Sequence, residues 1–318
     1  EITTRLVGSE MCIRDRIADR MALMVNQVFD HYADYHGAVI LAAAIGYVIQ
    51  LYMEFSGCMD IIIGSGKLFG ICLPENFRQP FCAKNPSEFW RRWHITLGAW
   101  FKAYIFYPVS VSGLVKKWNQ YGRKHCGKHI TRLVTSAIAL FPVWVANGVW
   151  HGAQWNYIFY GMYYFVLIML GIAVEPVRDR ILETCHINPE TRAWRMIQIA
   201  KTWVIIVVGE LFFRANGLKA GWYMFCNMIK RFDAGQLTDG TLYTLGLERA
   251  DYLAVIVGCL IVGIVGSMKE HGISVQKKMG ELAVPVRWGL YYALVIGILI
   301  FAAYGDGYQI QDLIYAGF

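Results

Sequence analysis

The chain has 318 residues, of which 56% are apolar and only 17% charged, and its formal net charge is +7. Soluble domains carry roughly 25% charged residues, and the mean hydropathy here is +0.38. This balance excludes an ordinary soluble enzyme and predicts an all-α, polytopic transmembrane helical bundle.

Several apolar stretches approach the ~20 residues that cross a bilayer. They cover residues 37–53, 61–73, 133–150, 155–174, 197–213, 252–267 and 286–304. We expect a single membrane domain over residues 17–318. Residues 1–16 have no helical or strand period and resemble translated sequencing adapter, so we expect a non-native start and an N-terminally truncated protein.

The first part of that domain combines charged and apolar positions. Residues 17–36 alternate them at a spacing that predicts an amphipathic helix at the membrane interface. In the apolar helix that follows, Gln50, Glu54 and Gly57 lie near one stripe. Polar side chains on such a stripe face a bundle interior, where structural hydrogen bonding is favoured over catalysis.

A tryptophan-framed histidine follows a proline-rich loop. We expect Ser87 to be the N-cap of a helix that carries Trp90, Arg91, Arg92 and His94. That helix is too polar to face lipid, so it lies at the interface or is buried by protein. Trp90 and His94 are four residues apart and would share one helical face.

A basic cluster separates this segment from the next apolar stretch. Its members are Lys116, Lys117, Arg123, Lys124, Lys128 and Arg132. The cluster predicts a short polar loop on the cytoplasmic side. A nucleic-acid site is the alternative, but nothing nearby supports one and we expect no nucleic-acid partner. His125, Cys126 and His129 have metal-like spacing, yet in so basic a loop we expect no metal.

The eight cysteines form no C-x-x-C pair, so we interpret them as packing residues.

The second tryptophan-framed histidine is His151. Asn147, His151 and Trp155 are spaced by four, which predicts an amide, an imidazole and an indole along one helical face. Gly148 and Gly152 form a G-x-x-x-G pair that allows close helix packing. Two interpretations stay open: a catalytic imidazole, or a buried histidine that hydrogen-bonds a neighbour beside two packing glycines.

Two such histidines in membrane-like sequence favour acid–base chemistry inside the bilayer. Ionisable groups at membrane depth are costly and mark pathways or reactions, and imidazole exchanges its proton near neutral pH. We predict His151 and His94 as catalytic residues. The predicted substrate-binding residues are Asn147, Trp90, Trp93, Trp150, Trp155, Arg91 and Arg92.

An ordered series of segments, 50–57, 60–64, 74–77, 88–94 and 150–156, resembles the membrane-bound O-acyltransferases. The likeness is to the bacterial branch of alginate O-acetylation and lipoteichoic acid D-alanylation proteins, and it runs from about Gly46 to Ala173. In that family's pattern, His151 takes the place of the invariant histidine and His94 that of the second conserved one. Residues 102–110 depart from the pattern, lacking an acid and two glycines.

The resemblance implies transfer of an acetyl or D-alanyl type of acyl group across a bacterial cytoplasmic membrane. The donor would be a cytoplasmic thioester, acetyl-CoA or an acyl carrier protein, with no bound cofactor. The acceptor would be a hydroxyl of a cell-surface polysaccharide or its carrier, with membrane lipid and a secreted or periplasmic acyltransferase as partners. His151 would be the general base. Asn147 would orient its ring or bond the reacting carbonyl, and His94 would steady the donor.

Two other functions are compatible with the same residues. A polytopic transporter or flippase would use the histidines to relay protons, but the chain shows no internal duplication of the kind common in transporters. A non-catalytic scaffold that hands acyl groups to a partner enzyme would need a similar tunnel, so the sequence leaves that alternative open.

Overall fold

The structure is a computed structural model that describes residues 17–273 and 275–300. The expected artefact at residues 1–16 lies outside these ranges. Within them the regular structure is helical, with no strand. The chain divides into two compact units, one formed by Pro80–Leu218 and the other by the residues before and after it. The expected single membrane domain stays a prediction.

Five helices in the described ranges are long and apolar enough to span a membrane, which confirms the all-α membrane class. They are α2 (Ala38–Leu68), α7 (Gly127–Trp150), α8 (Trp155–Ala173), α10 (Arg192–Arg214) and α12 (Arg249–Glu270). The stretches predicted at 37–53 and 61–73 are one helix, α2, because the polar residues between them do not interrupt it. At about 1.5 Å per residue its 31 residues extend about 46 Å, more than a hydrocarbon core.

In the unit that holds α2, polar side chains fix the ends of the helices. Gln236 accepts hydrogen bonds from the backbone N–H groups of Ala38 (3.0 Å) and Val39 (3.4 Å), and so caps α2. Residues 17–30 form the predicted helix, and its Arg20 pairs with Asp251 of α12 at 2.9 Å. The remaining elements of this unit are α11 (Leu218–Lys230), η3 (Ala234–Leu237), η4 (Thr241–Leu245), α13 (Val275–Gly280) and α14 (Val284–Ile300).

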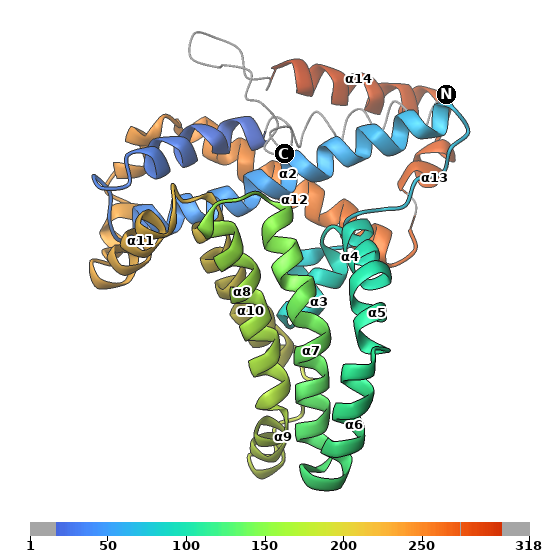
Figure 1. Ribbon diagram of the computed structural model, residues 1–318. Coiled ribbons are helices and arrows are strands. Elements are labelled where there is room, and N and C mark those ends of the chain that lie inside the picture. Colours follow the sequence, from blue (N-terminus) through green and yellow to red (C-terminus); the bar gives the residue numbers. More distant parts are fainter. Residues whose placement is uncertain (1–16, 274, 301–318) are drawn as a thin grey trace. The chain divides into compact units, whose positions relative to one another are not determined.

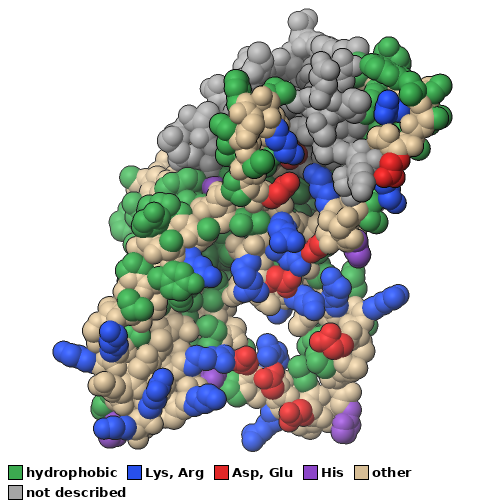
Figure 2. Space-filling model, turned by 90° about the vertical axis from the view of Figure 1, so that its right-hand side faces the viewer, with side chains coloured by type: hydrophobic (Ala, Val, Ile, Leu, Met, Phe, Trp, Pro, Cys, Tyr) green, Lys and Arg blue, Asp and Glu red, His purple; other side chains and the backbone are tan. Residues whose placement is uncertain are grey.

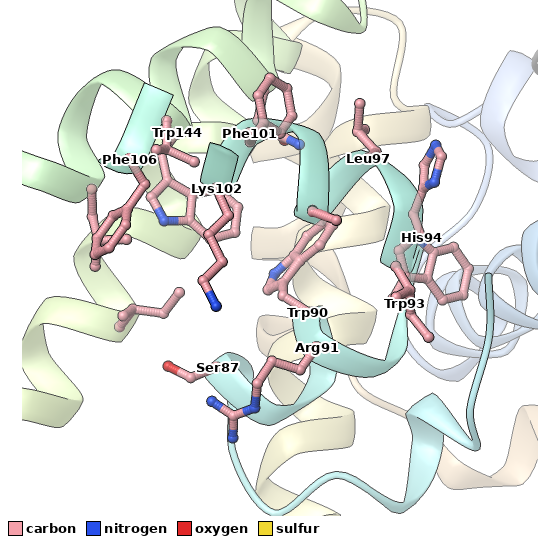
Figure 3. Close-up of a pocket in the computed structure, with 17 residues that line it drawn as sticks. Ser87, Trp90, Arg91, Trp93, His94, Leu97, Phe101, Lys102, Phe106 and Trp144 are labelled. Atoms are coloured by element: carbon pink, nitrogen blue, oxygen red, sulfur yellow. The ribbon is translucent and has the colours of Figure 1, made fainter. Parts of the chain in front are cut away.

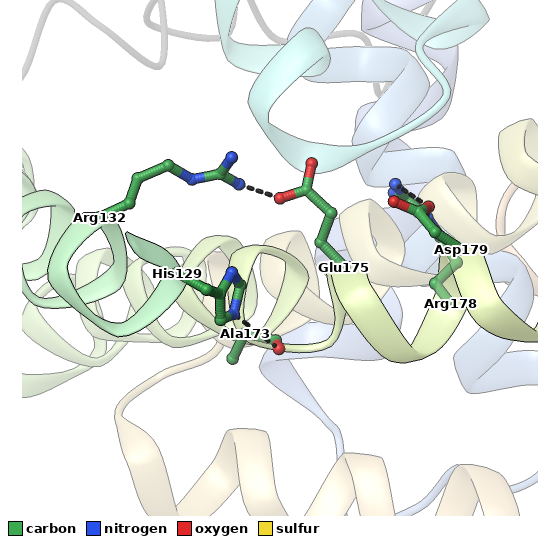
Figure 4. A network of polar contacts seen from close by, with 6 residues as sticks. All are labelled: His129, Arg132, Ala173, Glu175, Arg178 and Asp179. Carbon is green, nitrogen blue, oxygen red and sulfur yellow. Dashed lines mark hydrogen bonds and ion pairs between the residues drawn. The ribbon is translucent and has the colours of Figure 1, made fainter. Parts of the chain in front are cut away.

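In the Pro80–Leu218 unit, α7, α8 and α10 lie side by side and alternate in direction (Figure 1). Two contacts join the start of α7 to the junction of α8 and α9 (Glu175–Thr184): His129 Nε2 hydrogen-bonds the Ala173 carbonyl at 3.3 Å, and Arg132 pairs with Glu175 (Figure 4). At the other end, Asn156 at the start of α8 donates to the Phe213 carbonyl near the end of α10, at 3.1 Å.

Glycines allow α7 and α8 to approach closely. A Cβ on Gly148 would lie 2.7 Å from the Tyr157 carbonyl oxygen, and one on Gly161 would overlap the Trp144 carbonyl oxygen. Gly148 therefore permits close helix packing as predicted, but Gly152 does not. Gly152 lies beyond the end of α7 with φ 134°, and the second close contact comes from Gly161 on the facing helix.

The predicted polar loop at 116–132 is helical instead. Most of its basic residues lie on α6 (Gly113–His125), which turns at Gly127 and packs back against the start of α7. A helix forms because these side chains stay exposed while Val115 and Gly122 pack inward. Figure 2 shows Lys and Arg side chains gathered at the lower end of the molecule, where α6 lies. In the part of the chain that the structure describes, no three His, Cys, Asp or Glu side chains form a metal site.

Candidate active site

The segment that carries the first histidine is a series of short helices. They are α3 (Pro86–Arg92), α4 (Ile95–Phe101), the π-helix η2 (Lys102–Phe106) and α5 (Tyr107–Ser110). Asn85, rather than the predicted Ser87, is the N-cap of α3, and its side chain accepts from the Glu88 N–H at 2.9 Å. The reason is Pro86: proline fits the first helical position, so the cap precedes it.

The chain breaks at His94 instead of continuing as one helix. Trp93 is extended and His94 is left-handed, at φ 47° and ψ 54°. The prediction that Trp90 and His94 share one helical face is therefore wrong. Left-handed backbone is uncommon for residues other than glycine, although histidine is enriched there. The break redirects the chain into α4, and both residues still line one cavity.

The π-helix also has a local cause. The Tyr107 N–H bonds to the Lys102 carbonyl five residues back, and Pro108 has no N–H with which to continue an α-helical ladder. The wider turn presents Lys102 and Phe106 to the cavity. Single π turns inside α-helical segments occur frequently at functional sites.

A cavity of about 500 Å³ lies among α3, α4, η2 and α7, with Ile168 of α8 (Figure 3). Five of the predicted site residues line it: Trp90, Arg91, Trp93, His94 and Asn147. Sequence reasoning missed the other lining residues, among them Lys102 and Trp144. The Trp90 and Trp144 rings meet edge to face, 5.2 Å between centroids, and form an aromatic wall.

Charge in the cavity has one sign. Arg91 and Lys102 are its two fixed cations, and its described lining residues include no carboxylate. Figure 3 shows both side chains extending toward the side of the cavity where Ser87 lies, with His94 at another edge. Arg92, also a predicted substrate contact, points elsewhere: it pairs with Glu88 at 3.0 Å within α3 and does not line the cavity.

His151 lies just beyond the cavity lining, with only 4% of its surface exposed. Its ring contacts those of Trp150 (4.7 Å between centroids), Phe213 (4.9 Å) and Tyr160 (6.1 Å). Trp150 also meets His94 edge to face at 5.8 Å. A single indole therefore contacts both imidazoles.

The predicted alignment of Asn147, His151 and Trp155 on one helix is wrong. The helix α7 ends at Trp150, the chain turns through Gly152, and Trp155 begins α8. Asn147 and His151 stay one turn apart, but Trp155 is 74% exposed and outside the cavity. Glycine at φ 134° permits this turn, which a helical spacing rule does not anticipate.

Burial sets the charge state of both histidines. It lowers the pKa of His94 to about 4. Burial, and secondarily the neighbouring His94, lowers the pKa of His151 to about 3. Both imidazoles are therefore neutral across the physiological range, because a charged ring loses hydration that the surrounding aromatic groups do not replace.

A buried acid lies behind His151. The Tyr160 hydroxyl donates to Glu210 Oε1 at 2.6 Å, and Glu210 is 2% exposed. Sequence reasoning missed this pair. Glu210 is the sole acid in α10, and a lone acid in an apolar span was the available signal.

Comparison with known proteins identifies the family. Residues 23–123 match the model of MBOAT, the membrane-bound O-acyltransferase family. The probable alginate O-acetylase AlgI of Pseudomonas aeruginosa is 30% identical over 246 residues, covering 77% of this chain and 40% of the relative. The chain belongs to the membrane-bound O-acyltransferase family.

Two further relatives carry other names. The peptidoglycan O-acetyltransferase of Helicobacter pylori is 30% identical over 214 residues, covering 67% of this chain and 36% of the relative. The teichoic acid D-alanyltransferase of Bacillus subtilis is 37% identical over 123 residues, covering 39% of this chain and 29% of the relative. The chain thus spans 40% or less of the length of these three relatives.

Proposed function

We propose that this chain carries the acyl-transfer site of a membrane O-acyltransferase. The relatives' names, O-acetylase, O-acetyltransferase and D-alanyltransferase, support an acetyl or D-alanyl group and a surface-polymer acceptor. On the same likeness, the donor is a cytoplasmic thioester of CoA or a carrier protein, and the protein lies in a bacterial cytoplasmic membrane. The observation that carries the proposal is a pair of neutral, buried imidazoles joined by Trp150 beside a cavity.

His151 acts as the general base in this proposal. Its neutral ring takes the proton of the acceptor hydroxyl as that oxygen attacks the thioester carbonyl. The tetrahedral intermediate then collapses to the ester, and the departing thiolate takes the proton back from His151. A low pKa keeps the base form available, and the negative charge that develops beside the ring stabilises the proton it receives.

The other site residues have supporting roles. Asn147 is one turn before His151 and lines the cavity, so its amide can orient a bound carbonyl or hydroxyl. His94 steadies the donor at the cavity edge. Trp90, Trp93 and Trp144 wall the cavity and exclude water, which protects a thioester from hydrolysis.

Entry to His151 requires a side chain to move. His151 is nearly closed off, whereas Trp150 is 41% exposed and touches both imidazoles. Trp150 does not itself line the cavity, but rotation of its indole would uncover His151 at the cost of one aromatic contact to each histidine. We therefore propose Trp150 as the residue that opens the path.

Replacing the base tests the proposal directly. The protein, purified into nanodiscs, is given a radiolabelled acyl thioester and a glycan acceptor. His151→Gln should lose about 10²–10⁴-fold in transfer rate, the usual contribution of a general base. His129→Gln is the matched control, since His129 bonds Ala173 away from the cavity and should leave the rate unchanged. Wild-type transfer by His151→Gln, at equal folded protein, would rule out this base.

A relay scaffold is the second candidate, favoured by one observation: His151 does not line the cavity. In that case the chain delivers an acyl group to a secreted partner enzyme that performs the final transfer. Transfer to the glycan by the purified protein alone supports direct catalysis. Transfer that appears only after a periplasmic fraction is added supports relay.

A further inference from the structure

The apolar helix α10 contains one acid, Glu210, which the proposed chemistry does not use. It lies within a candidate membrane span and is 2% exposed. An ionisable side chain at such depth is costly to keep, and in membrane proteins it usually faces the bundle interior with a specific partner. The partner here is Tyr160 of α8, whose hydroxyl donates to Glu210 Oε1 at 2.6 Å.

Tyr160 connects this acid to the histidine. Its ring meets the His151 ring edge to face, with centroids 6.1 Å apart and planes at 86°. Phe213, three residues beyond Glu210 on α10, contacts both the His151 ring (4.9 Å) and the Tyr160 ring (4.8 Å). The His151 imidazole therefore packs against two rings. The Tyr160 ring is held by the hydrogen bond to Glu210, and the Phe213 ring belongs to the helical turn that follows Glu210.

The remaining oxygen of the acid supports a specific role. Glu210 Oε2 is buried and has no hydrogen-bond partner among the described residues. Leaving a buried polar atom in this state lowers stability, because the atom has lost its hydration without gaining a partner. An aliphatic side chain would avoid the cost, so stability alone does not account for an acid here. What the acid adds is an acceptor that fixes the Tyr160 hydroxyl.

We propose that Glu210 is a positioning residue for His151 and acts through Tyr160. The inference rests on the proposed function in that it takes His151 as the base. Anchoring the Tyr160 hydroxyl holds its ring edge against the imidazole, which restricts rotation of the His151 side chain. A base must keep its nitrogen aimed at the acceptor hydroxyl, and misplacement by about 1 Å can cost 10²-fold in rate.

Four variants separate the anchor from its surroundings. Glu210→Leu removes the acceptor and Tyr160→Phe removes the donor but keeps the ring. Glu210→Gln keeps an acceptor oxygen of the same reach and should rescue. Tyr163→Phe is the matched control: it deletes another α8–α10 hydrogen bond, from the Tyr163 hydroxyl to the Ile205 carbonyl at 2.9 Å.

In the transfer assay, Glu210→Leu and Tyr160→Phe should each lower kcat by about 10–10²-fold with KM unchanged. The double variant should be no worse than either single variant, because both delete one link. Glu210→Gln and Tyr163→Phe should stay within about threefold of wild type, because both leave the Tyr160 hydroxyl with its acceptor at position 210.

Histidine NMR of the whole chain in nanodiscs gives a readout independent of activity. With ¹³C at Cε1, the His151 signal is the one that disappears in His151→Gln. It should be a single narrow line in wild type, Glu210→Gln and Tyr163→Phe, and shifted or broadened in Glu210→Leu and Tyr160→Phe. An unchanged signal in the last two, or equal disturbance by Tyr163→Phe, overturns the proposal. Absence of transfer by wild type would instead count against the proposed function, while the NMR still decides positioning.

Discussion

At the scale of single residues, the decisive property of this site is the absence of charge on its histidines. An exposed imidazole titrates near 6.5, but His94 and His151 are held by aromatic rings that cannot replace water around an imidazolium. Each ring is therefore ready to accept a proton at neutral pH without first losing one.

This leads to a pH prediction. Because burial lowers the pKa values of His94 and His151 to about 4 and about 3, kcat/KM should be flat from pH 8 to about 5. It should fall only as the pH drops below about 4, where the first of the two rings gains a proton. Initial rates in a series of constant-ionic-strength buffers measure this. A fall centred near pH 6.5 would show that the rings are solvated in the working enzyme.

Sequence reasoning found the residues that lie in recognisable motifs and missed those supplied by packing. Trp90, Arg91, Trp93, His94 and Asn147 were predicted together and line one cavity. Lys102 and the Tyr160–Glu210 pair lie outside the motifs, and no local spacing places them beside the motifs. Trp144 is three residues before Asn147 on α7, so helical spacing was an available signal for it. Arg92 and Trp155 sit in the motifs but face elsewhere, since motif membership does not fix side-chain direction.

At the scale of elements, hydropathy predicted the spans well and their ends poorly. The cores of α7, α8, α10 and α12 were anticipated, because burial in lipid requires long apolar runs. Helix breaks depend on individual backbone conformations. The left-handed His94, the π turn at 102–106 and the turn at Gly152 each interrupt a pattern that helical periodicity would continue.

The contact between α7 and α8 gives a prediction at this scale. Gly161→Ala should destabilise the protein by about 1–3 kcal/mol, the usual cost of overpacking, because its Cβ would overlap the Trp144 carbonyl. Gly171→Ala on the same helix is the matched control. Nothing lies within 4 Å of its Cβ, so better helix propensity should make it neutral or stabilising by up to about 1 kcal/mol.

Thermal unfolding of the two variants in the same detergent measures the difference. Equal midpoints for Gly161→Ala and Gly171→Ala would show that α7 and α8 can separate without cost.

At the scale of the whole molecule, the property that matters is which end of the helices α7, α8 and α10 faces the cytoplasm. Within the Pro80–Leu218 unit the start of α7, the end of α8 and the start of α10 share one end, and the His151 turn is at the other. The basic residues of α6 and early α7 mark the first end, which we expect to face the cytoplasm.

Cysteine labelling tests this orientation. Native Cys185, exposed between α9 and α10, and a cysteine placed at the exposed Ala153 should react with an impermeant maleimide from opposite sides of the membrane. The comparison uses inside-out and right-side-out vesicles of a variant that lacks the other cysteines. Labelling of both positions from one side would contradict the assignment of α8, the candidate span between them, as a membrane-crossing helix.

The basic residues and the His151 turn lie at opposite ends of α7, and this separation determines how far an acyl group has to travel. About 34 Å separates the first residue of α7 from its last, by the rise of about 1.5 Å per residue. If the cationic end faces inward as we expect, the histidine turn faces outward, and under the proposed function a polymer acceptor would stay hydrated at the outer surface. Only the small acyl group would then have to cross, along the cavity walled by tryptophan rings.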